Sequence, residues 1–151
     1  MTMRFHYHRF KVRRPVVSLG GALYRSRPIV RVTVVAPKGT SIEDGLLDTG
    51  ADDTVFSDSM ALKLGIDLSA APTGEAGAAG GARYPVFYSR VKLRITDGIE
   101  FREWDAWVTF TRSVLRRPLL GMAGFLQFFR ADFNTDLELV DLTINRLYPG
   151  I

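Results

Sequence analysis

Apolar residues at every second position are the feature that most constrains the fold of this 151-residue chain. The pattern recurs in three segments, residues 29–35, 90–95 and 129–142. In the first segment, Val30, Val32 and Val34 fall on one face of an extended chain, as in a half-buried strand. We therefore predict an all-β protein, mostly β with one or two short helices.

Turn and capping residues place the helices and hairpins between these strands. Ser57 is a good N-cap and Gly65 a good stop signal, so we expect a short helix over 58–64. Asp97-Gly98 predicts a two-residue hairpin turn that leads into a strand over 99–110. We also expect a second short helix over 125–129, a closing hairpin with its turn at 134–136, and a mobile, glycine-rich hairpin tip within 73–82.

Residues 1–27 form a basic N-terminal arm, which we separate from a domain over 28–151. Gly20-Gly21 and Pro28 are the breaks in this region. The arm can be partly disordered, or it can contact a second subunit. Its two histidines, His6 and His8, have no nearby carboxylate and make a poor metal site.

Composition excludes several classes of protein. The chain has no cysteine, so it has no disulfide, thiolate metal site or sulfur nucleophile. It has no run of roughly 20 apolar residues and no apolar core of a secretory signal, so we expect a cytoplasmic protein without a membrane partner. The basic residues do not continue as a stripe with aromatics beyond the arm, so we expect no nucleic-acid partner.

The chemistry of the chain is concentrated in residues 45–54, Gly-Leu-Leu-Asp-Thr-Gly-Ala-Asp-Asp-Thr. Two apolar residues precede the Asp-Thr-Gly tripeptide, and a Leu-Leu-Gly element, residues 119–121, follows about seventy residues later. This order resembles the retropepsin family of retroviral and retroviral-like aspartic proteases. The resemblance covers about residues 28–129. It implies a closed acid-protease-like barrel with one half-site per chain.

The resemblance also implies the chemistry. Asp48 would be catalytic and, because the motif occurs once, a second copy would supply the second aspartate of a homodimer. The pair would activate a water to hydrolyse a peptide bond in a peptide or protein substrate, without a metal or organic cofactor. Thr49 would hydrogen-bond across the dimer axis, and Gly50 would let the substrate backbone approach.

The resemblance assigns further residues to substrate binding. Asp52 would contact the substrate main chain, and Ala51, Asp53, Val55 and Leu119 would line side-chain pockets. The flap that closes over the substrate would be Gly77, Ala78, Ala79, Gly80 and Gly81.

One position departs from the viral family pattern. An arginine usually follows the Leu-Leu-Gly element and pairs with an acid of the active-site loop, but Met122 stands there. Asp52 therefore loses its expected partner, for which Arg116 and Arg117 are candidate substitutes. These two arginines also suggest acidic residues in the substrate, although an exposed basic turn is the more common explanation of such a pair.

Rival interpretations of the same residues fit less well. A calcium loop beginning at Asp48 lacks the required ligand spacing, and the glycine-rich stretch lacks the Gly-x-x-x-x-Gly-Lys of a phosphate loop. A non-catalytic, dimeric module with the protease fold, binding peptides or acting as a scaffold, remains the alternative function.

Overall fold

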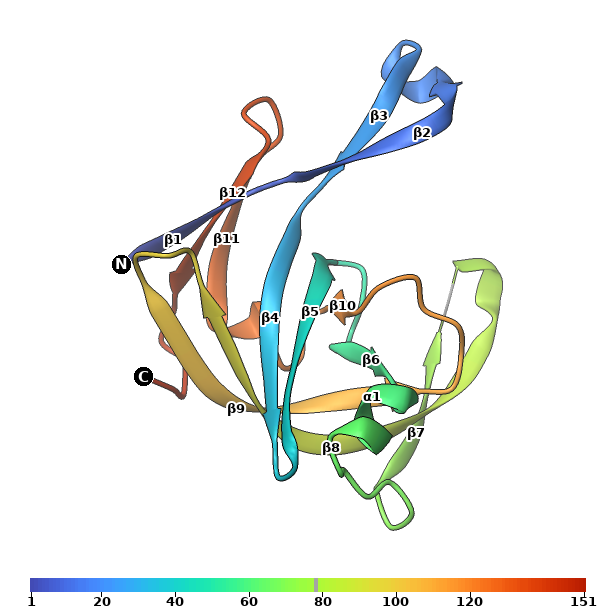
Figure 1. The fold of residues 1–151 in the computed structure, drawn as a ribbon, viewed down its shortest axis with the longest axis vertical. Coiled ribbons are helices and arrows are strands. Elements are labelled where there is room, and N and C mark those ends of the chain that lie inside the picture. Colours follow the sequence, from blue (N-terminus) through green and yellow to red (C-terminus); the bar gives the residue numbers. More distant parts are fainter. Residues whose placement is uncertain (78) are drawn as a thin grey trace.

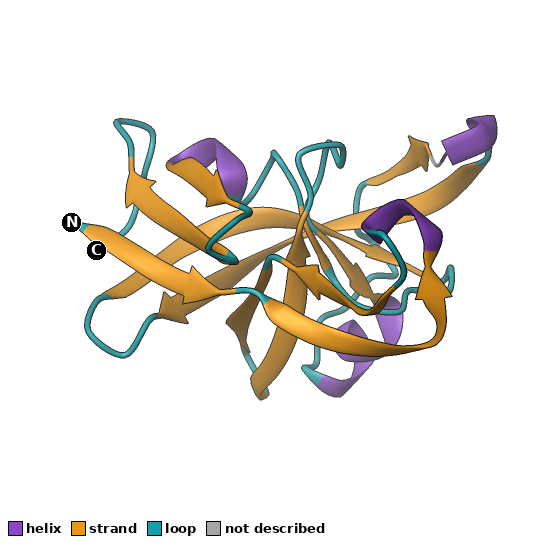
Figure 2. Cartoon of the chain, turned by 90° about the horizontal axis from the view of Figure 1, so that it is seen from above, coloured by secondary structure: helices purple, strands orange, loops and turns teal. Residues whose placement is uncertain are grey.

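The computed structural model describes residues 1–77 and 79–151, in which strands predominate (Figures 1 and 2). The strands are β1 (Thr2–His6), β2 (His8–Val16), β3 (Ala22–Arg27), β4 (Ile29–Ala36), β5 (Gly39–Leu47), β6 (Val55–Ser57), β7 (Thr73–Gly77), β8 (Arg83–Thr96), β9 (Phe101–Thr111), β10 (Leu119–Leu120), β11 (Phe129–Asn134) and β12 (Leu139–Ile144). Strands hold 58% of the residues and helices 9%, which confirms the prediction of a mostly-β chain.

A closed barrel forms the centre of the molecule. Within the described residues its strand order is β4-β5-β10-β6-β9-β8, and pairing of β4 with β8 closes the ring. β7 lies outside the ring as the antiparallel partner of β8. The predicted closed, acid-protease-like barrel is confirmed.

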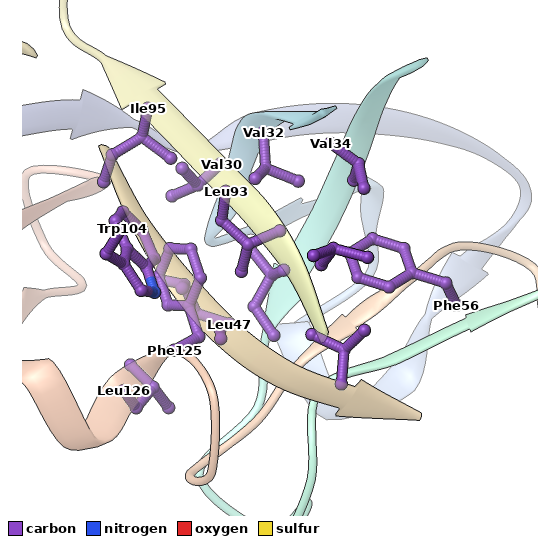
Figure 3. Close-up of a cluster of buried hydrophobic side chains, with 14 of the residues drawn as sticks. Val30, Val32, Val34, Leu47, Phe56, Leu93, Ile95, Trp104, Phe125 and Leu126 are labelled. Atoms are coloured by element: carbon purple, nitrogen blue, oxygen red, sulfur yellow. The ribbon is translucent and has the colours of Figure 1, made fainter. Parts of the chain in front are cut away.

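The apolar alternation of the sequence fills this barrel. Val30, Val32 and Val34 of β4 are fully buried and face Leu93 and the other core residues of β8 and β9 (Figure 3). Trp104 packs edge-on against Phe125, with ring centroids 5.4 Å apart. Burial of one face of each strand is what the alternation predicted.

The helices of the described residues are short. α1 (Asp58–Lys63) begins at the expected N-cap, where the Ser57 side chain accepts a hydrogen bond from the Ser59 amide. Single 3₁₀ turns, η1 (Val17–Leu19), η2 (Ala79–Gly81) and η3 (Leu126–Phe128), make up the rest, and η3 lies within the second predicted helix. None of these helices has the length and apolar character needed to cross a membrane.

The N-terminal arm consists of strands joined by a 3₁₀ turn, where we expected a segment that can be partly disordered or can contact a second subunit. β1 pairs antiparallel with β12, and this places Met3, which is 1% exposed, in the core opposite Leu142. Arg4 donates two hydrogen bonds of 2.8 Å to the Asp141 carboxylate. β2 and β3 then form a hairpin. The division of the chain at residue 27 stays a prediction.

The turn between β8 and β9 also differs from expectation. Thr96 pairs with Phe101, so the loop has four residues in place of the predicted two. Asp97 explains the longer loop, because its carboxylate accepts hydrogen bonds from the amides of Ile99 and Glu100. The predicted closing hairpin is confirmed as β11 and β12.

Candidate active site

Asp48 directly follows the last residue of β5, and its main chain is fixed from both sides. Its amide donates to the Leu120 carbonyl oxygen at 3.1 Å, because β10 runs parallel to β5. Its carbonyl oxygen accepts from the Ala51 amide at 3.2 Å, and its carboxylate accepts from the Gly50 amide at 2.9 Å. The strand and the turn together orient a half-buried carboxylate.

Two more hydrogen bonds join the loop after Asp48 to the residues after β10. The Met122 amide donates to the Ala51 carbonyl oxygen at 2.9 Å, and the Ala123 amide donates to that of Asp52 at 2.8 Å. The residue before Met122 must be a glycine, Gly121, since a Cβ atom there would lie 2.7 Å from the Ala51 oxygen. The Leu-Leu-Gly element therefore holds the active-site loop, although seventy residues separate them.

A cleft of about 660 Å³ opens in front of Asp48. Three segments line it: the loop after β5, the β7–β8 hairpin and the segment before β10. The predicted site residues that line it are Asp48, Gly50, Ala51, Asp52, Asp53, Val55, Gly77 and Leu119.

The other predicted site residues have different positions. Thr49 is exposed beside the cleft, and Gly80 and Gly81 lie at the tip of the β7–β8 hairpin without lining the cleft. Ala78 falls outside the described residues, as does the side chain of Ala79. The glycine-rich stretch is thus the hairpin tip that we predicted, and the cleft walls come from the strands below it.

Sequence reasoning missed seven residues of the cleft wall, Glu75, Ala76, Arg83, Tyr84, Ser113, Val114 and Leu115. Glu75 and Arg83 form an ion pair of 2.9 Å across the hairpin. An acid and a base flanking a glycine-rich tip are a usable signal for such a pair. The segment before the Leu-Leu-Gly element carries no comparable local signal.

Carboxylates dominate the charge of the cleft. Burial raises the pKa of Asp53, and the neighbouring Asp52 raises it further. Among residues 1–77 and 79–151, no ion pair joins Asp52 or Asp53 to a basic side chain. Asp52 thus has no cationic partner in this part of the chain, as Met122 had led us to expect.

Arg116 and Arg117 do not fill this role. Both line a separate pocket of about 330 Å³, together with Glu43 and Lys63. The guanidinium of Arg117 lies 4.5 Å from the centre of the Phe10 ring. Neither arginine lines the cleft, so the suggestion that they select acidic substrate residues loses its basis.

The comparisons with known proteins agree with this geometry. The family model described as aspartyl protease matches residues 30–123, well over half of the chain. A solved structure, a retropepsin-like aspartic protease from Rickettsia conorii, superposes with a TM-score of 0.55 at 20% sequence identity, covering 94% of this chain and 98% of that one. A search of curated proteins found no match. The matched model and the shared fold, together with the Asp-Thr-Gly turn held by a Leu-Leu-Gly element, place this chain in the retropepsin family of aspartyl proteases.

Proposed function

We propose that this protein is an aspartic endopeptidase whose catalytic pair consists of Asp48 from each of two copies. The observation that carries the proposal is the position of Asp48, a half-buried carboxylate that lines a cleft and is oriented by hydrogen bonds from a turn and a strand. Membership of the aspartyl protease family supports it.

The need for a second copy follows from chemistry. Activation of water requires two carboxylates that share a proton, and the chain contains one Asp-Thr-Gly. Two carboxylates within hydrogen-bond reach cannot both ionise at low cost, so one stays protonated. The ionised carboxylate removes a proton from the water, and the protonated one polarises the scissile carbonyl. The tetrahedral diol then collapses as a proton passes to the leaving amine.

The proposed substrate is a peptide in extended conformation. The cleft is bounded by the loop after β5 and by the β7–β8 hairpin, and a hairpin at this position can close over a bound chain and exclude water. Gly50 lines the cleft without a side chain, which leaves room for a substrate main chain. We assign Thr49 to contacts between the two copies, because its side chain is exposed beside Asp48.

One observation favours the alternative of a non-catalytic peptide-binding module. Asp52 lacks the arginine partner that viral relatives are expected to have, so the hydrogen bonds that join the active-site loop to the residues after β10 are those of main-chain amides and of the uncharged Thr54 hydroxyl. A loop with this support can bind a peptide without the alignment that catalysis needs.

The test is cleavage of a diverse peptide library between about pH 4 and 7, the range over which a carboxylate pair shares a proton. Wild type is compared with Asp48→Asn and with a matched control, Asp136→Asn, which alters an exposed turn residue outside the cleft. We expect wild type and the control to cut at the same bonds and Asp48→Asn to cut none.

Two results would count against the proposal. Cleavage by Asp48→Asn at the wild-type rate would place the activity at another centre. Absence of cleavage by a wild type that is dimeric in solution would favour the peptide-binding module.

The cytoplasmic location stays a prediction.

A further inference from the structure

The hairpin formed by β2 and β3, residues 8–27, is here called the basic hairpin. Figure 1 shows it projecting beyond the rest of the molecule, with the turn η1 at its far end. Three apolar side chains near this end are exposed: Val17 by 94%, Leu19 by 50% and Leu23 by 59%. An isolated two-stranded hairpin is only marginally stable in water, so a surface that covers these side chains would stabilise it.

Contacts with the rest of its own chain gather at the base of the hairpin. Arg9 donates to the Glu138 carboxylate at 2.7 Å, and the Ser26 hydroxyl donates to the other oxygen of that carboxylate. The ring of Phe10 lies under the guanidinium of Arg117. These contacts fix the direction in which the hairpin extends from the body. They do not cover its apolar end, which stays exposed.

The hairpin is also strongly basic. Residues 1–27 contain seven of the 20 Lys and Arg residues of the chain and none of its 16 Asp and Glu residues, so residues 28–151 have a net charge of −3. Six of the seven basic residues belong to the hairpin: Arg9, Lys11, Arg13, Arg14, Arg25 and Arg27. The hairpin of one copy is therefore complementary in charge to the body of another.

The base of the hairpin adjoins the catalytic turn. β3 continues through Pro28 into β4, and the Pro28 carbonyl oxygen accepts a hydrogen bond of 3.0 Å from the amide of Leu47, the residue before Asp48. A second copy that places its own Asp48 opposite this one therefore lies next to the base. The nine residues of β2 span about 30 Å, roughly the diameter of a domain of this size.

From these observations we infer that the basic hairpin of each copy lies across the body of the second copy. The apolar end would be buried there, and the arginines would lie against a body with a net charge of −3. The inference rests on the proposed dimer around Asp48, and it assigns to the N-terminal arm the task of holding that dimer together.

The experiment measures the dimer dissociation constant by sedimentation velocity over a dilution series. Wild type is compared with the tip variant Val17→Ser, Leu19→Ser, Leu23→Ser. The matched control is Ile42→Ser, Leu62→Ser, Ile99→Ser, which removes three side chains of similar exposure from the body. We expect the tip variant to raise the dissociation constant about 100-fold or more, since two hairpins are affected in each dimer, and the control to leave it unchanged.

A second variant tests the charges. Arg13→Glu, Arg14→Glu is expected to weaken the dimer, and the wild-type dissociation constant is expected to rise between about 0.05 and 0.5 M salt. Because the exposed tip contributes little to the core, thermal unfolding should show both variants folded at low temperature.

The outcomes separate this inference from the proposed function. An unchanged dissociation constant in the tip variant, with cleavage intact, overturns the role of the hairpin and leaves the enzyme standing. Loss of binding to phosphatidylserine vesicles or to an oligonucleotide in the tip variant, with the dimer dissociation constant unchanged, also overturns the role of the hairpin in the dimer and leaves the enzyme standing. Weakened association without any cleavage by dimeric wild type supports the hairpin and overturns the enzyme. A wild type that is monomeric at all concentrations overturns both.

Discussion

Substitutions at Gly45 and Leu120 would test how tightly β10 packs against β5 behind the cleft. Gly45 lies in β5, and a Cβ atom added there would lie 2.6, 2.9 and 2.9 Å from Cγ, Cδ1 and Cδ2 of Leu120. Leu120 is fully buried, and its carbonyl oxygen accepts the hydrogen bond from the Asp48 amide. The two residues are therefore expected to be strongly coupled.

The expected changes in the free energy of unfolding follow from the side-chain volume that each substitution adds or removes. Gly45→Ala forces extra atoms into a filled space and should lower the free energy of unfolding by about 1–3 kcal/mol. Leu120→Ala leaves a cavity and should lower it by about 2–5 kcal/mol. In the double variant the new methyl group occupies the space that the three deleted carbons leave. Its destabilisation should therefore fall short of the sum of the two single effects by about 1–3 kcal/mol.

The assay is urea unfolding of wild type, both single variants and the double variant at one protein concentration, because the stability of the proposed dimer would depend on concentration. Gly77→Ala is the control, since nothing lies within 4 Å of the added Cβ atom. It should stay within about 0.5 kcal/mol of wild type. Strict additivity of the two single effects, or a Gly45→Ala variant as stable as wild type, would refute the packing argument.

Two further predictions concern the cleft and the core. The pKa of Asp53 is raised by burial and by Asp52, so the folded state favours the protonated form of this carboxyl group. The stability that results is present below the pKa of the unfolded chain, about 3.9. It is lost as the pH rises through the pKa of the folded state. Asp53→Asn should thus raise the melting temperature at pH 7 and change it little at pH 3; an equal shift at both pH values would contradict the assignment. The Trp104 indole donates a 3.0 Å hydrogen bond to the Gly124 carbonyl oxygen in the core, so Trp104→Phe should cost about 2–4 kcal/mol of unfolding free energy in urea. Trp107→Phe, at a half-exposed position, should cost about 0.5 kcal/mol or less, and equal effects of the two substitutions would refute the role of that hydrogen bond.

Local patterns were enough to predict β4, β9, part of β8 and the Asp-Thr-Gly turn. Val30, Val32 and Val34 alternate because β4 buries one face, and this periodicity is visible in any window that contains the strand. The turn after β5 was predicted from residues 45–54 together with the Leu-Leu-Gly element at 119–121. The placement of Asp48 in the cleft agrees with that prediction.

The contacts that the sequence did not predict join residues far apart in the chain. β1 was not assigned as a strand, and its pairing with β12 buries Met3 opposite Leu142, 139 positions away. Arg117 lies over the ring of Phe10, 107 positions away, a contact that no local pattern encodes. Val114, 98% exposed, lines the cleft only because the barrel brings its segment opposite Asp48. Such contacts depend on the closed topology.

The insertion of β10 between β5 and β6 has a consequence for the order of events during synthesis. β10 pairs with both strands, so the turn that holds Asp48 lacks its hydrogen bonds to residues 120, 122 and 123 until that segment has left the ribosome. Contacts of this sequence separation form late in folding, because the intervening chain must first be ordered. A nascent chain thus carries Asp48 for some seventy residues before the complete cleft can form around it. The topology itself delays assembly of the cleft until the barrel has closed.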